Sequence, residues 1–453
     1  MAGNVERDDR VIAPGLEPET AQAAADSAAV EDRNAVQDYV DRVIARAREL
    51  RASDAFAPAT RQVGYTITAA QAKRTTRVYK LNNRYTALAF LVALIVVAAI
   101  SLFLPYEGIK TMGGSGSVYG PDVVFAGYDL WFKTTIMPLF DPSLQGQVNQ
   151  LYADFSAQYG TGTYTYVINR LAVTVIAIAC GIMLAVSGAL FQTAFQNPLA
   201  TPTMLGVSEG VTVGCIIYTM TNHLAIGDDP VMYTLLVYGC GALAVVVVLL
   251  FSRLLSGSKR FNVVDMLLLG TVICQLLGGV SAFIQTFVMD DTMWSNFYDT
   301  QQAADALTEP VLQVIVIVLF AITFIAAFVL RFRLNLVAFD NDEGNLMGAR
   351  ANALRIGALV LGSVMQLAAL ASVGQVAMLS LAVPFLVRYL MPADFRSQFL
   401  GNCLVGSLLL LVVLVVQHFA VIGYVIMPVG TLVSIVIIPF FVWVVVLSKA
   451  RWV

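Results

Sequence analysis

Few residues in this chain have the types and spacing that catalysis needs. Its 453 residues include only two histidines, His223 and His418, and no His-Glu-x-x-His run, so metal hydrolysis and His-based proteolysis are poor fits. The chain also lacks Gly-x4-Gly-Lys-[Ser/Thr], the loop that cradles nucleotide phosphates. Ser187-Gly188 supplies two residues of an intramembrane serine-protease motif, but the preceding glycine is missing and such pairs commonly help helices pack. We therefore expect a chain that is not an enzyme and that needs no cofactor or metal.

The cysteines and the charges exclude two further classes of protein. All five cysteines lie inside separate apolar runs, which is typical of small packing residues rather than of a disulfide framework or a metal site: Cys180, Cys215, Cys240, Cys274 and Cys403. No clustered basic face of the kind that nucleic-acid binders carry is present.

An Asn-Pro turn interrupts the apolar sequence between residues 188 and 207. Pro198 has no N–H to donate and restricts Asn197 to extended geometry, so an apolar helix that contains Gln192 must end before it. A helix broken at a membrane boundary is tolerated where protein or a water-filled path covers the freed backbone groups. The segment is therefore a candidate element of a transport pathway, with an ordinary interfacial loop as the alternative.

A second segment, within residues 335–355, could dock a soluble partner. Charged residues and glycines alternate around a small apolar knob, which suits insertion of a short helix into a partner's groove: Asp342, Glu343, Gly344, Gly348 and Arg350. An ordinary charged loop is the alternative.

The elements that position these segments are apolar spans. The chain is 58% hydrophobic with a mean hydropathy of +0.76, as in polytopic membrane proteins. Since a span needs about 20 apolar residues, we predict an all-α fold with ten spans at 85–104, 167–195, 203–222, 231–254, 264–288, 309–334, 356–373, 375–391, 401–422 and 429–447.

The distribution of charges predicts the orientation of the spans. An inside N-terminus places the basic short loops inside, whereas the outside loops carry Asp228, Asp229, Asp290 and Asp291. Both termini are therefore expected on the cytoplasmic side of the cell membrane.

Two segments are longer than the spans require. Residues 1–84 form a hydrophilic leader with one amphipathic helix from Glu31 to Arg51 and without the apolar core of a signal peptide. Residues 105–165 form a long outer loop whose scattered aromatics favour partial folding over the outer face.

Taken together, these segments resemble the FecCD family of ABC importer permeases, over about residues 85–453. The resemblance lies in Ser187-Gly188-Ala-Leu-Phe-Gln192, Asn197-Pro-Leu-Ala200-x-Pro202, Leu205-Gly206-Val207-Ser208, Leu268-Leu-Gly270, Pro384 with Arg388, Asp394-Phe-Arg396, and Pro428-Val-Gly430 through Pro439-Phe-Phe441.

The resemblance implies the fold, the partners and the mechanism. The fold is the type II ABC importer permease architecture, in which this permease pairs with a second copy or a paralogue, a cytoplasmic ATPase dimer and an extracytoplasmic substrate-binding protein. Asp342-Glu343-Gly344-x-x-x-Gly348 is similar to the family's coupling loop, Glu-Ala-Ala-x-x-x-Gly. The expected function is import of a ferric-siderophore or haem-like chelate by alternating access, with cobalamin as the alternative cargo.

Several residues depart from the family's pattern. Gln196 replaces the usual arginine before the Asn-Pro turn, Thr201 an aspartate, and Phe385 a histidine. Of the outer arginines that pair with the binding protein, only Arg170 matches, and His418 stands near the end of span nine. Docking could therefore shift onto the long outer loop, where Lys110 and Lys133 lie.

The pathway residues are predicted from polar side chains within the spans. Gln275, Gln285 and Thr286 of span five are candidate pore-facing residues, with interhelical hydrogen bonding as the alternative. Gln192, Asn197 and Pro198 could belong to an inner gate.

The rival class of protein is an autonomous secondary transporter, which generally needs an intramembrane charge. Asp265 and Glu309 lie near span ends rather than in span interiors, which argues against a secondary transporter.

Overall fold

Long apolar helices make up most of the chain in the computed structural model. The structure describes residues 83–103, 121–140, 146–160, 163–222, 229–255, 263–301, 309–334, 351–391, 395–419, 421–422 and 425–449. The membrane-type helices are α5 (Asn83–Phe103), α9 (Thr163–Ala194), α10 (Val207–Asn222), α11 (Pro230–Leu255), α12 (Val263–Phe287), α15 (Pro310–Leu330), α17 (Ala351–Val373), α18 (Ala377–Leu390), α19 (Phe395–Phe419) and α20 (Val429–Lys449). Each predicted span coincides with one of these helices, so the all-α expectation is confirmed.

Length and composition separate these helices into two groups. Seven are long and apolar enough to cross a membrane, namely α5, α9, α11, α12, α15, α17 and α19. The apolar stretches of α18 and α20 are shorter, and α10 has only 16 residues. The end of span nine differs from the prediction. There the helix ends at Phe419, and β1 (Val421–Ile422) pairs antiparallel with β2 (Val425–Ile426) in a small hairpin.

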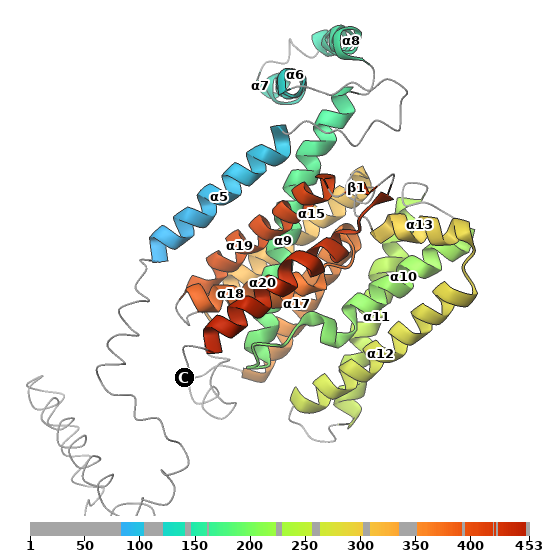
Figure 1. Ribbon diagram of the computed structural model, residues 1–453, viewed down its shortest axis with the longest axis vertical. Helices are drawn as coiled ribbons and strands as arrows, with labels where there is room; N and C mark the ends of the chain where they lie inside the picture. Colours follow the sequence, from blue (N-terminus) through green and yellow to red (C-terminus); the bar gives the residue numbers. More distant parts are fainter. Residues whose placement is uncertain are drawn as a thin grey trace, which may run out of the picture. The chain divides into compact units, whose positions relative to one another are not determined.

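Helix α9 lies at the centre of the bundle, in contact with α5, α15, α17, α18 and α19 (Figure 1). Small residues let the helices approach closely, as is usual within membranes. A Cβ placed on Gly181 of α9 would lie 2.6 Å from the carbonyl oxygen of Gly406 in α19. One buried polar bond also joins α9 to α17, from Ser187 Oγ to Gln366 Oε1 at 2.9 Å.

Helices α10, α11 and α12 pack against one another beside this centre, with α13 (Asp291–Gln301) against α10 (Figure 1). Tyr233 of α11 joins the two groups by donating its hydroxyl to the carbonyl of Ala371 in α17, at 3.0 Å. In contrast to the buried α9 and α17, α12 is largely exposed, with Phe287 at 74% and Leu268 at 68%. A long exposed surface on α12 is therefore available to lipid, water or a partner.

The predicted outer loop contains regular structure where it is described. It forms α6 (Pro121–Trp131), a π-helical turn (Phe132–Ile136), α7 (Met137–Phe140) and α8 (Val148–Tyr159). Phe125 of α6 stacks on Phe103 at the end of α5, with ring centroids 4.6 Å apart. Tyr152 of α8 donates to the hydroxyl of Tyr164 in α9 at 3.0 Å. The described part of this segment is thus largely helical, and we call residues 121–140 and 146–160 the outer module.

Candidate translocation site

The Asn-Pro turn ends α9 as its sequence predicts. The helix stops at Ala194, and the backbone N–H groups of Phe195 and Asn197 donate to the last carbonyls, those of Phe191 and Gln192. Gln196 takes a left-handed conformation with φ 51°, and the Asn197 side chain accepts from the N–H of Leu199 at 3.0 Å. The chain then passes through a short 3₁₀ turn, η5 (Pro202–Leu205), into α10.

Protein covers the non-helical backbone of η5. The carbonyl of Thr203 accepts from the thiol of Cys274 in α12 at 3.1 Å. The carbonyl of Met204 lies so close to Gly270 that a Cβ there would overlap it. Because these groups are shielded by α12, the interruption can exist within an apolar bundle.

A second helix break, which the sequence did not reveal as a site, separates α17 from α18. Gly374 adopts φ 79°, and the chain is non-helical over residues 374–376. The Gln375 amide donates across to α10, to the carbonyl of Ser208 at 3.1 Å and to the hydroxyl of Thr212 at 2.9 Å. The only signal in the sequence was a Gly-Gln pair inside an apolar run.

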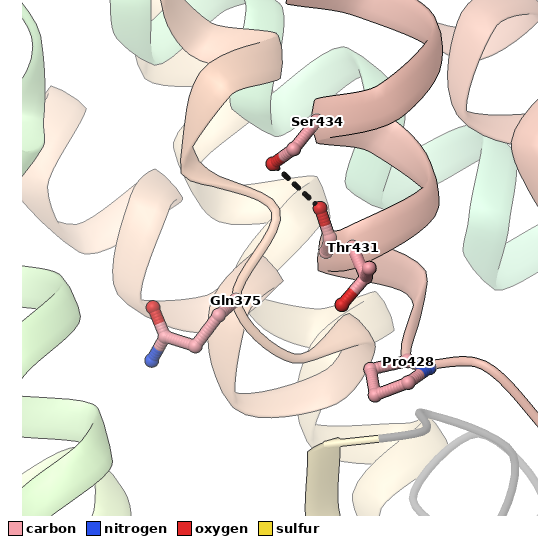
Figure 2. Close-up of a pocket in the computed structure, with 5 residues that line it drawn as sticks. Gln375, Pro428, Thr431 and Ser434 are labelled. Atoms are coloured by element: carbon pink, nitrogen blue, oxygen red, sulfur yellow. Dashed lines mark hydrogen bonds between the residues drawn. The ribbon is translucent and has the colours of Figure 1, made fainter.

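A polar cavity of about 270 Å³ opens beside this second break (Figure 2). It is lined by Gln375 on one side and by the first turns of α20 on the other, through Pro428, Gly430, Thr431 and Ser434. The Ser434 hydroxyl donates a hydrogen bond to the carbonyl of Gly430 at 2.9 Å. Irregular backbone beside a polar cavity is the arrangement that membrane transport proteins place along a pathway.

We expect Gln375→Leu to lower the stability of the bundle. Leucine has a similar volume but removes both hydrogen bonds that Gln375 donates to α10, while the Ser208 carbonyl keeps the bond from the Thr212 hydroxyl, so we expect a cost of about 1 kcal/mol. The midpoint of thermal unfolding in detergent should fall by several degrees. Gln275→Leu is the matched control, because Gln275 is exposed on α12. Equal midpoints for the two variants would contradict the linking role.

The predicted pathway residues do not form one cluster. Gln192 is fully buried, and its Nε2 donates to the carbonyl of Leu381 at 3.3 Å, so in this conformation it packs α9 against α18. Asn197 and Pro198 lie in the turn after α9. On α12, Gln275 and Thr286 are exposed and Gln285 is half-buried. Their roles in transport stay predictions.

The two predicted docking residues lie near the outer module and at the end of α19. Arg170 of α9 donates to the carbonyl of Ser101 in α5 at 2.9 Å, which ties the two helices together. Burial raises the pKa of the Tyr128 phenol, and the charge of Arg170 acts in the opposite direction. His418 belongs to α19, and its side chain lies outside the described residues. Lys133 forms an ion pair with Asp129 at 2.6 Å, and Lys110 lies outside the described residues.

The predicted coupling residues Asp342, Glu343, Gly344, Gly348 and Arg350 also lie outside the described residues. Their segment joins α15 to α17. At the end of α15 the Arg331 guanidinium stacks on the Phe328 ring, 3.6 Å from its centroid, and lies 6.0 Å from that of Phe399 in α19. The helix that leads into the segment is thus anchored to α19.

One acidic residue besides Asp265 and Glu309 lies in a predicted span. Glu209 lies within predicted span three, in the first turn of α10, and is half-buried. A Cβ on Gly278 of α12 would be 3.5 Å from its Oε2. Within the described ranges, no group of three or more His, Cys, Asp or Glu side chains could hold a metal ion.

Comparison with known proteins agrees with the fold. The chain is 28% identical over 283 residues to the hemin transport system permease protein HmuU of Yersinia pestis, which covers 62% of this chain and 83% of that protein. It is 29% identical over 276 residues to the "Probable heme-iron transport system permease protein IsdF" of Staphylococcus aureus strain Newman, covering 58% of this chain and 77% of the relative.

A solved structure has the same fold. It is described as a metal-chelate type ABC transporter in an inward-facing conformation, and it superposes with a TM-score of 0.59 at 19% identity, over 80% of this chain and 99% of that one. The expected permease architecture is therefore confirmed. The sequence profile of the FecCD transport family matches residues 137–447, more than half of the chain, and this chain belongs to that family.

Proposed function

We propose that this chain is the permease subunit of an ABC importer that moves an iron chelate, a ferric-siderophore or a haem-like compound, into the cell. The observation that carries the proposal is the similarity to relatives named for hemin and heme-iron transport, within the FecCD transport family. The helix breaks and the polar cavity support a pathway role. Cobalamin is the alternative cargo.

The proposed assembly has two copies of this chain, or one copy with a paralogue, and a separate ATPase dimer. The ATPase binds residues 335–355 on the cytoplasmic side, where both termini of the permease also lie. ATP-driven closure of the dimer moves α15 and α17, which flank that segment, and alternating access follows. The permease itself hydrolyses no nucleotide.

Uptake of radioactive iron tests the cargo. Cells that lack this chain are supplied in parallel with a ferric-siderophore, haem and a weak iron chelate. We expect uptake of one chelate to be lost and to return with the intact chain. Unchanged iron uptake together with lost cobalamin uptake would overturn the iron assignment in favour of cobalamin.

We further propose that the substrate-binding protein docks on the outer module. In place of the outer arginines that this chain lacks, the module presents exposed aromatic side chains: Phe140 is 86% exposed and Phe132 is 49% exposed. Aromatic side chains of this kind often dominate binding at interfaces. Lys133 contributes less than the sequence indicated, since Asp129 already pairs with it.

We expect Phe132→Ala with Phe140→Ala to weaken binding of the loaded binding protein about tenfold, which is roughly 1.4 kcal/mol. Point variants are preferable to deletion of residues 113–160, which would remove the buried Val124 and Phe155. Phe287→Ala, at a similarly exposed phenylalanine of α12, is the control. Unchanged affinity in the double variant would refute docking at this module.

A further inference from the structure

Two arginines lie at the end of α15, where the helix leaves the apolar part of the bundle. From Pro310 to Leu330 the helix carries no charged side chain over its 21 residues. At about 1.5 Å per residue it is about 31 Å long, which matches the roughly 30 Å of hydrocarbon in a bilayer. Arg331 and Arg333 follow directly and are therefore at the level of the lipid headgroups.

The Arg331 guanidinium is held against two rings but has no anion. It stacks on Phe328, 3.6 Å from the ring centroid, and lies 4.7 Å from that of Phe332. Stacking uses the flat face of the guanidinium and leaves the N–H groups along its edge to donate. Within the described part of the chain, neither Arg331 nor Arg333 has an acidic partner, and Arg331 Nε is buried without an acceptor. Such a buried donor is costly unless an acceptor reaches it.

The end of α15 exposes an apolar patch beside this guanidinium. Four side chains lie on one side of the helix, at i, i+3, i+4 and i+7, and are between 42% and 63% exposed: Ile325, Phe328, Val329 and Phe332. Phe328 also contacts Phe399 of α19, with ring centroids 6.1 Å apart. The patch therefore borders the contact between the two helices, at the depth of the hydrocarbon.

Depth and charge together select the partner of this surface. A soluble protein does not reach an apolar patch within hydrocarbon, and free phosphate gains nothing from it. A phospholipid reaches both levels, because its acyl chains cover the patch and its phosphate meets the arginines. Guanidinium groups bind phosphate oxygens through paired hydrogen bonds, and basic residues beside membrane helices attract anionic lipids. In phosphatidylcholine the ammonium group offsets the phosphate charge, so an anionic phospholipid is the better match.

We infer that Arg331 and Arg333 bind the phosphate of an anionic phospholipid, whose acyl chains cover the apolar patch at the end of α15. This lipid site depends on the fold alone. The bound lipid also anchors the start of residues 335–355, because both arginines come immediately before that segment. Anionic lipid should therefore increase coupled transport, a consequence that rests on the proposed function.

Fluorescence quenching by brominated lipids measures the site in a bilayer. The full permease, with Cys240→Ser and Cys274→Ser, carries a bimane label on Val329→Cys within the patch; the other three cysteines are buried. Brominated phosphatidylglycerol is titrated against brominated phosphatidylcholine. We expect the anionic lipid to bind beside the label about tenfold more tightly, the equivalent of roughly 1.4 kcal/mol. A label on Val314→Cys, exposed toward the other end of α15, should show no such preference. Equal binding of the two lipids at Val329→Cys would overturn the site.

Substitution of the arginines tests their role. Arg331→Gln with Arg333→Gln should abolish the preference, and Arg333→Gln alone, which keeps the stacked arginine, should lower it about threefold. Arg253→Gln is the matched control and should leave the preference intact, because Arg253 is an exposed arginine at the end of another helix, α11. A preference that survives loss of both arginines would overturn the assignment. Displacement of phosphatidylglycerol by equimolar glycerol phosphate would also overturn it, in favour of a site for free phosphate.

Reconstituted transport tests the consequence. The permease with its ATPase is placed in vesicles of phosphatidylcholine, with or without phosphatidylglycerol. We expect the anionic lipid to raise uptake of the iron chelate several-fold, and the variant that lacks both arginines to lose this increase. An increase that persists in the variant would overturn the link to transport. No uptake by the unmodified complex in either kind of vesicle would instead refute the proposed function, and the quenching results would still decide the lipid site.

Discussion

Gly188→Ala should largely prevent this permease from folding. A Cβ at Gly188 of α9 would overlap the backbone carbonyl of Ser380 in α18, and it would also lie 3.1 Å from Cγ of Pro384. A backbone group inside a packed bundle cannot move aside as a flexible side chain can, so the cost should reach at least about 3 kcal/mol. Since α9 is central, separation of α18 from it would disturb the whole bundle.

The measurement is the yield of monodisperse protein after gel filtration in detergent. We expect the yield to fall to about a tenth or less, as expected for about 1.4 kcal/mol or more of destabilisation. Gly357→Ala in α17 is the matched control, because no atom lies within 4 Å of the Cβ that it adds. Alanine there should leave the yield unchanged or raise it. A normal yield for Gly188→Ala would contradict the close approach of α9 and α18.

Gly348→Ile should uncouple ATP hydrolysis from transport. A bulky β-branched residue cannot follow the close backbone approach that a glycine permits, so the segment would no longer fit the groove of the ATPase. Reversal of both charges, with Asp342→Lys and Glu343→Lys, should have the same effect. We expect transport to fall more than about tenfold, the equivalent of 1.4 kcal/mol in coupling, while ATP hydrolysis continues.

The control for charge reversal is Asp291→Lys, an exposed position on α13 outside both the coupling segment and the outer module. Its transport rate should remain normal, and all variants should elute from gel filtration like the unmodified protein. Normal transport by Gly348→Ile together with the charge-reversed variant would show that this segment is not the coupling loop.

The positions of the spans could be predicted because they depend on local sequence. A helix across a membrane needs a long apolar run, and each predicted run is a helix in the structure. The end of α9 was also predictable, since Pro198 acts only on its immediate neighbours. In both cases the physical cause lies within one segment of the chain.

The candidate site was less predictable because its contacts join distant segments. Gln375 donates hydrogen bonds to Ser208 and Thr212, which lie more than 160 positions earlier in the chain, and nothing in the local sequence specifies that contact. Gln192 illustrates the opposite case. A glutamine in an apolar helix is equally suited to a pathway and to a buried hydrogen bond, and in this structure it donates to Leu381. Glu209 carries the clearest local signal, a charge within a predicted span.

Uptake into reconstituted vesicles tests the central claim most directly. Purified permease is placed in liposomes with and without its ATPase, and entry of a radioactive iron chelate is measured with loaded binding protein outside and ATP inside. We predict uptake only when the permease, the ATPase and ATP are all present. Uptake by the permease alone, driven by an ion gradient, would contradict the account and identify an autonomous secondary transporter.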